Sequence, residues 1–141
     1  MSEEVRGSVH WSFWLVGAVA LVWNGLGSVN YFIQMTTDSL DAYRAVEQAI
    51  ITDRPAWATG AFAIAVFGGT VGALLLLLRK AAAIYVFVVS LLGVVATTAH
   101  TVSIDAAFGA GELVVIVAMP VAVGAFFIWY AKYAEGRAWI R

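Results

Sequence analysis

The chain has 141 residues, of which 62% are hydrophobic and only 12% are charged. A soluble domain carries about 25% charged residues, so this composition excludes an ordinary water-soluble globule and predicts a single membrane-embedded domain over residues 1–141. The net charge of −1 without a basic run argues against nucleic acid as a partner, and the lack of cysteine excludes disulfides and thiol chemistry.

A helix that crosses a membrane needs about 20 mostly apolar residues, because the hydrocarbon core is about 30 Å thick. The sequence predicts four such spans, over about 12–35, 57–78, 81–102 and 111–133. Only Arg79 and Lys80 separate the second span from the third, so these two spans form a tight helical hairpin. We therefore expect an all-α integral membrane bundle of four transmembrane helices.

The first span carries an unusually polar segment, LVWNGLGSVNYFIQM, over residues 21–35. On a helix most of its polar and small residues share one face, and lipid offers no hydrogen-bond partner for an amide. Two interpretations stay open, which are close packing against another helix and the lining of a solute cavity. The residues concerned are Trp23, Asn24, Gly27, Asn30, Tyr31 and Gln34.

The loop between the first two spans has its own apolar periodicity. Leu40, Tyr43, Val46 and Ile50 recur at helical spacing, with charged and amide residues between them. This pattern predicts a short amphipathic helix on the membrane surface, which Pro55 ends before the second span begins. The helix is either a simple connector or a lid over a site.

The second span is rich in glycine. Gly68 and Gly72 are four residues apart, as are Gly69 and Ala73. Such pairs let two helices approach closely, within the chain or between copies of it. This glycine pattern indicates helix packing and points to no catalytic or binding chemistry.

The third and fourth spans hold the remaining polar candidates. His100 near the end of the third span and Glu112 at the start of the fourth are expected at a similar depth, where they could form a polar cluster. The alternatives are that His100 bonds to a neighbour and that Glu112 serves the helix amino terminus. Pro120 is expected to disturb the fourth helix at mid-span.

No ionisable residue falls near the middle of a span, and no nucleophile–base pair or metal-ligand spacing occurs. We therefore expect neither enzyme activity nor a cofactor or metal, and ion-coupled transport is disfavoured. An uncoupled facilitator could still work with amides and aromatic rings.

Basic residues set the expected orientation. Arg44 and Arg54 fall on one side of the predicted topology, and the other basic residues fall on the opposite side. That richer side is expected to be the cytoplasm of a bacterial inner membrane, with both chain termini in it and the two long loops outside. The residues on it are Arg6, Arg79, Lys80, Lys132, Arg137 and Arg141.

Three short motifs carry a resemblance to a known group. They are the Trp23–Asn24 pair, the Pro55–Ala56–Trp57 entry to the second span and the Gly68–Gly69 pair. With the segment from about Trp11 to Tyr133 that holds them, they resemble a family of small four-span inner-membrane proteins of proteobacteria. Some members are labelled "sugar transporter", which implies a substrate class but no set of binding residues.

Two functions from different classes follow. In the first, the chain is a non-catalytic accessory or assembly component, which packs against itself or a larger membrane complex through its amide and glycine faces. In the second, it is a facilitative transporter of a small, sugar-like solute. Four short spans enclose little volume, so the transporter is expected to act as a homo-oligomer surrounded by lipid.

Overall fold

The computed structural model describes residues 8–36, 40–52, 54–104 and 108–141. These residues form α1 (Trp11–Thr36), α2 (Ala45–Thr52), α3 (Ala56–Leu77), α4 (Ala82–Ser103), α5 (Ala110–Leu113), the π-helical turn η1 (Val114–Ala118) and α6 (Met119–Gly136). Because α5, η1 and α6 run on as one helix, four helices are long and apolar enough to cross a membrane. The predicted all-α bundle is confirmed, and so is the short helix in the first long loop.

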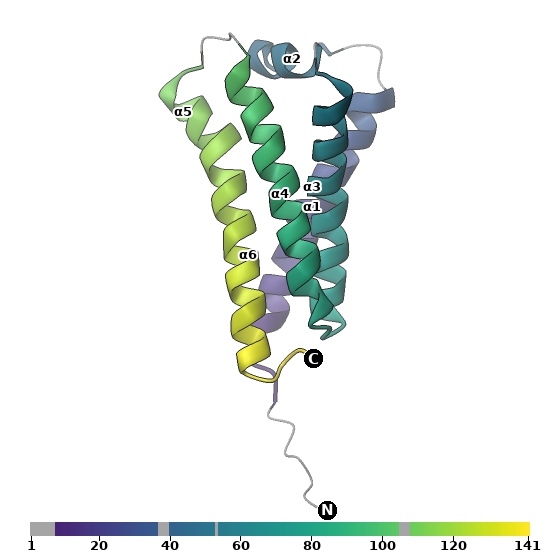
Figure 1. The fold of residues 1–141 in the computed structure, drawn as a ribbon, viewed down its shortest axis with the longest axis vertical. Coiled ribbons are helices and arrows are strands. Elements are labelled where there is room, and N and C mark those ends of the chain that lie inside the picture. Colours follow the sequence, from purple (N-terminus) through teal and green to yellow (C-terminus); the bar gives the residue numbers. More distant parts are fainter. Residues whose placement is uncertain (1–7, 37–39, 53, 105–107) are drawn as a thin grey trace, which may run out of the picture.

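The four long helices stand side by side, and α2 lies across one end of them (Figure 1). We call this end the α2 end. The opposite end holds the start of α1, the turn at Arg79 and Lys80, and the tail 137–141, and we call it the terminal end. The basic residues of α6 and of this turn therefore gather at one end, while Arg6 lies outside the described residues.

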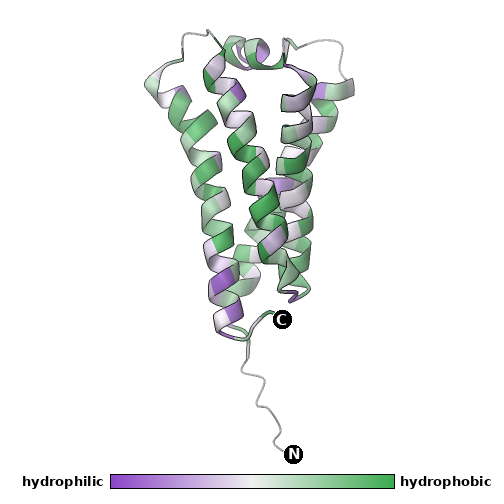
Figure 2. Ribbon diagram, in the orientation of Figure 1, coloured by the Kyte–Doolittle hydropathy of each residue, from purple (hydrophilic) through white to green (hydrophobic). Residues whose placement is uncertain are grey.

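Large apolar side chains cover the outward surfaces of the long helices, and hydrophilic residues lie mostly towards the two ends (Figure 2). A soluble monomer rarely exposes so much apolar surface to water, whereas the hydrocarbon tails of lipids solvate such a surface. The chain is accordingly a multi-pass membrane protein by the length and composition of its helices.

Small residues bring the central helices together. A Cβ atom added at Gly27 of α1 would lie 2.8 Å from Val66 of α3, and one added at Gly72 of α3 would lie 2.7 Å from the Phe87 ring of α4. Gly68 lies against Ser90 in the same way. The glycine faces that the sequence singles out are thus occupied by other helices of the same chain.

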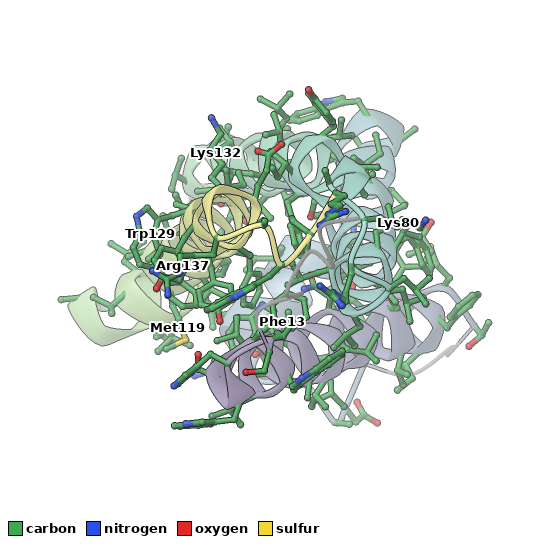
Figure 3. The ribbon with its side chains drawn as sticks, turned by 90° about the horizontal axis from the view of Figure 1, so that it is seen from below. Phe13, Lys80, Met119, Trp129, Lys132 and Arg137 are labelled. Carbon is green, nitrogen blue, oxygen red and sulfur yellow. The ribbon has the colours of Figure 1, made fainter. Side chains whose placement is uncertain are left out.

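The terminal end is closed by a packed core and by the tail. Phe13 and Leu76 are fully buried, and Trp139 of the tail packs edge-on against Phe13. The Arg79 side chain donates a hydrogen bond through Nε to the Trp139 carbonyl oxygen at 2.7 Å. The Arg141 N–H donates to the Arg79 carbonyl oxygen at 3.0 Å. Seen from below, the tail crosses from α6 towards the turn between α3 and α4 (Figure 3).

The α2 end is wider, because α1 leans away from α6 along its length (Figures 1 and 3). α1 packs on α3, α3 on α4 and α4 on α6. At the terminal end α1 also meets α6, where the Ser12 and Tyr130 hydroxyl groups lie 3.3 Å apart. The backbone irregularity near Pro120 takes the form of the π-helical turn η1, which directly precedes α6.

Candidate functional site

The divergence of α1 from α6 leaves a cavity of about 480 Å³, which extends from α2 to Phe87 and Phe127. This volume falls within the range of about 300–1,000 Å³ that is usual for small-molecule sites. Its wall is mainly apolar, with contributions from Leu26, Val66, Phe87, Val94, Ile116 and Phe127. Its polar groups include Asn30, Gln34, Arg54, Ser90, Thr97 and Thr98.

On the polar face of α1, some residues line the cavity and others pack against α3. The residues on this face that line the cavity are Trp23, Asn24, Gly27, Asn30 and Gln34. Tyr31 instead packs against α3, where its ring centroid lies 5.5 Å from that of Phe62 and 5.3 Å from that of Phe67. Gly68, Gly69 and Gly72 lie in the contacts of α3 with its neighbouring helices.

Asn24 and Ser28 form the packed part of this face. The Asn24 amide donates to the Ala20 carbonyl oxygen at 2.9 Å, and its oxygen lies against Gly69, where a Cβ atom would overlap it. The Ser28 hydroxyl donates to the Val66 carbonyl oxygen at 3.2 Å and lies 3.0 Å from the Thr70 hydroxyl. These buried groups thus find partners within the chain, as membrane interiors require.

The segment that holds α2 covers the cavity and is bonded to α1. The Tyr43 hydroxyl donates to Asn30 Oδ1 at 2.7 Å, and Gln48 donates to the Tyr43 carbonyl oxygen at 2.9 Å. Ile50 and Ile51 of α2 add apolar side chains to the cavity wall. Of the two expected roles for this helix, the geometry matches a cover better than a simple connector.

Glu47 also reaches the cavity, but its charge is matched by a neighbour. Arg44 Nη2 lies 3.1 Å from Glu47 Oε1, and the Arg44 backbone N–H donates to Glu47 Oε2 at 3.0 Å. The hydrogen bond from Arg44 lowers the pKa of the Glu47 carboxyl group. Glu47 is therefore an ionised carboxylate that Arg44 already neutralises.

Arg54 is a charged cavity residue that sequence reasoning missed. Its guanidinium Cζ lies 5.1 Å from the centroid of the Phe62 ring, and its buried Nε has no hydrogen-bond acceptor among the described residues. Burial lowers the pKa of the Arg54 guanidinium, with Tyr31 and Tyr43 acting in the opposite direction. An arginine nevertheless stays protonated in proteins, so the cavity holds a fixed positive charge.

Arg54 lies at the entry to a span, because it directly precedes Pro55 and α3. A functional charge was expected only near the middle of a span, so the position of Arg54 in the sequence did not mark it. In the part of the chain that the structure describes, no carboxylate forms an ion pair with it.

Buried polar atoms without a partner are confined to the α2 end among the described residues. They are Gln34 Oε1, Arg54 Nε and His100 Nδ1. Such atoms are rare in native structures, because each loses its hydrogen bonds to water without replacing them. Their concentration at the cavity end indicates a region built for contact with something other than its own side chains.

His100 and Glu112 each make a contact of their own in the structure. The His100 ring is buried edge-on against Trp57 of α3, at a centroid distance of 5.8 Å. Glu112 instead accepts a hydrogen bond from the Gly109 backbone N–H at 3.0 Å, at the start of α5. Across the described ranges, no three acidic or histidine side chains lie close enough to hold a metal ion.

No family model matches the chain, and no curated protein or solved structure matches it either. The cavity and its polar atoms without partners are therefore the features that bear on function.

Proposed function

We propose that this protein is a facilitative carrier of a small solute, which it binds in the cavity beneath α2. The observation that carries the proposal is a cavity of ligand size whose buried polar atoms lack partners at one end. Packing alone would favour a filled interior, since empty space and unpaired polar atoms both destabilise a fold. A bound solute would supply both the missing volume and the missing hydrogen bonds.

The closed terminal end fits one half of a transport cycle. The cavity ends near Phe87 and Phe127, and beyond them lie the packed core and the tail with Trp139. A carrier needs access from one side at a time, so this arrangement corresponds to a conformation closed at the terminal end, with α2 as the cover on the other side. The basic residues at the terminal end support a cytoplasmic position for it in a bacterial inner membrane.

The test uses the absence of native cysteine. Thr98→Cys places a thiol in the cavity wall, and Thr70→Cys places one in the packed contact between α1 and α3. We expect a membrane-impermeant thiol reagent to label the Thr98→Cys variant from one side of the membrane and to spare the Thr70→Cys variant. Equal lack of labelling would show a dry cavity and would refute the carrier.

A second candidate, the accessory or assembly component, is favoured by an exposed aromatic row on α6. Trp129 stacks on Tyr133 at 5.8 Å and approaches Phe126 at 5.9 Å, and all three rings are exposed. Because the glycine faces are occupied within the chain, an exposed surface such as this aromatic row would have to receive a partner or a second copy. Purification in mild detergent, with identification of every co-purifying chain, tests it. A stoichiometric membrane complex that Trp129→Ala disrupts would favour this function.

A further inference from the structure

The cavity beneath α2 reaches the side of the bundle as well as its interior. Trp23 and Leu26 both line it, yet they remain 42% and 65% exposed. On the facing side it is bordered by Ile116 of η1 and Pro120 of α6. Figure 3 shows Met119 of the same segment on the side of α6 that faces α1. The cavity therefore opens between α1 and η1, at a depth that lipid occupies.

The chemistry of the cavity changes along its length. The part near this lateral opening is bordered by the apolar side chains of Leu26 and Ile116, and Val94 of α4 adds a further apolar group to the wall. The part under α2 holds the Arg54 guanidinium and the Gln34 amide, each with a buried atom that lacks a partner. A ligand that satisfies both parts has an apolar body and a polar head.

The charge of the cavity selects the kind of head group. Glu47 is already matched by Arg44, whereas Arg54 has no carboxylate partner among the described residues. A half-buried cation of this kind is stabilised by an oxyanion, since charge-assisted hydrogen bonds are shorter and stronger than neutral ones. Gln34 can add a hydrogen bond from its amide nitrogen to the same head group.

The geometry points to an amphiphile with an anionic head group as the ligand, which enters sideways from the membrane between α1 and η1 and places its head at Arg54 and Gln34. This inference rests on the proposed carrier function and names its substrate class. A carboxylate and a phosphate monoester share the required chemistry. A freely soluble sugar has no apolar body to contact the apolar wall, and it would not need an opening towards the lipid.

Binding to the full chain in phosphatidylcholine nanodiscs tests the inference. The probes are radiolabelled dodecanoate, dodecyl phosphate and neutral dodecanol, with empty nanodiscs as the background. We expect saturable binding of at least one anionic probe, much weaker binding of dodecanol and no competition by inorganic phosphate. The anion that binds identifies the head group as a carboxylate or a phosphate.

Matched variants assign the binding to the cavity and to its charge. Arg54→Gln is expected to lower the affinity for the anionic probe about tenfold or more, while Arg54→Lys retains most of it. Lys132→Gln removes the same charge from an exposed position on α6 and should have no effect. Val94→Phe fills the cavity and should abolish binding, whereas Val95→Phe, at an exposed neighbouring position, should not.

Other outcomes would overturn the inference in distinguishable ways. Dodecanol binding as strongly as the anions, and abolished by Val94→Phe, would refute the anionic head and leave the carrier standing. Competition by inorganic phosphate as strong as that by dodecyl phosphate would refute the apolar body. If no probe binds while the thiol reagent still labels the Thr98→Cys variant, the ligand class is wrong but the open cavity remains. If that labelling also fails, the carrier itself is refuted.

Discussion

Each end of this bundle holds a half-buried arginine, and the two differ in their hydrogen bonds. At the terminal end, Arg79 donates to the Trp139 carbonyl oxygen at 2.7 Å and joins the tail to the turn between α3 and α4. At the α2 end, the buried Arg54 Nε has no hydrogen-bond partner among the described residues. At the terminal end, the arginine forms a hydrogen bond that closes the fold. At the α2 end, the arginine lies beside a cavity and its buried nitrogen is without a described partner. Stability and binding are therefore expected to reside in different halves of the same helices.

The largest expected effect is on the core of the terminal end. Trp139→Ala removes a ring that is only 7% exposed and packs against Phe13 and Tyr133. We expect it to lower the free energy of unfolding by about 3–5 kcal/mol. Trp129→Ala removes the same ring at a position that is 60% exposed and should cost far less. Unfolding by SDS in mixed micelles measures both, and similar losses would contradict a packed terminal end.

The two arginines provide the most direct comparison. Arg79→Gln breaks a charge-assisted hydrogen bond to a carbonyl oxygen, so we expect a loss of about 1.5–3 kcal/mol. Arg54→Gln removes a half-buried charge that has no carboxylate partner among the described residues, so stability without ligand should stay the same or rise slightly. The same unfolding assay measures both variants. A larger loss for Arg54→Gln than for Arg79→Gln would reverse the assignment of the two ends.

The contact between Asn24 and Gly69 marks where the packed half of α1 meets the cavity. Gly69→Ala places a methyl group against the Asn24 amide, and overpacking of this kind costs about 1–3 kcal/mol. In the double variant Asn24→Ala and Gly69→Ala, the shorter side chain at position 24 removes the overlap. We expect the double variant to be more stable than the sum of the single changes predicts. Strict additivity in a double-mutant cycle would disprove this contact.

The smallest expected effect is a pH dependence at α2. The hydrogen bond from Arg44 holds the folded pKa of Glu47 below its ordinary value of 4.5. The stability that this pair contributes is therefore fully present above 4.5 and is lost as the pH falls through the folded pKa. Because the Arg44 side chain is 56% exposed and the Glu47 side chain 35% exposed, water screens the pair and the loss should be smaller than any above. Hydrogen exchange of the α2 amides, with Glu47→Gln as a pH-insensitive control, measures it.

The sequence alone determined the number and approximate ends of the four long helices, because length and apolar content are local properties that the membrane thickness converts into spans. It also determined the face of α1 that carries the amides, since helical periodicity fixes which residues lie together. Helical periodicity does not show how deep each residue of that face lies in the membrane or which helix it contacts. Asn24 borders the cavity and also packs against Gly69 of α3, whereas Gln34, three turns away, lines the cavity with a buried oxygen that has no partner among the described residues.

Only the tertiary structure decided where the cavity lies and what lines it. The cavity exists because α1 leans away from α6, and that crossing depends on the fit of Gly27 against Val66 and of Asn24 against Gly69. Arg54 enters it from a loop whose local sequence predicts only a helix start. The docking of the tail is likewise a long-range event, in which Trp139 meets Arg79. Such contacts join residues far apart in the chain, so no local pattern predicts them.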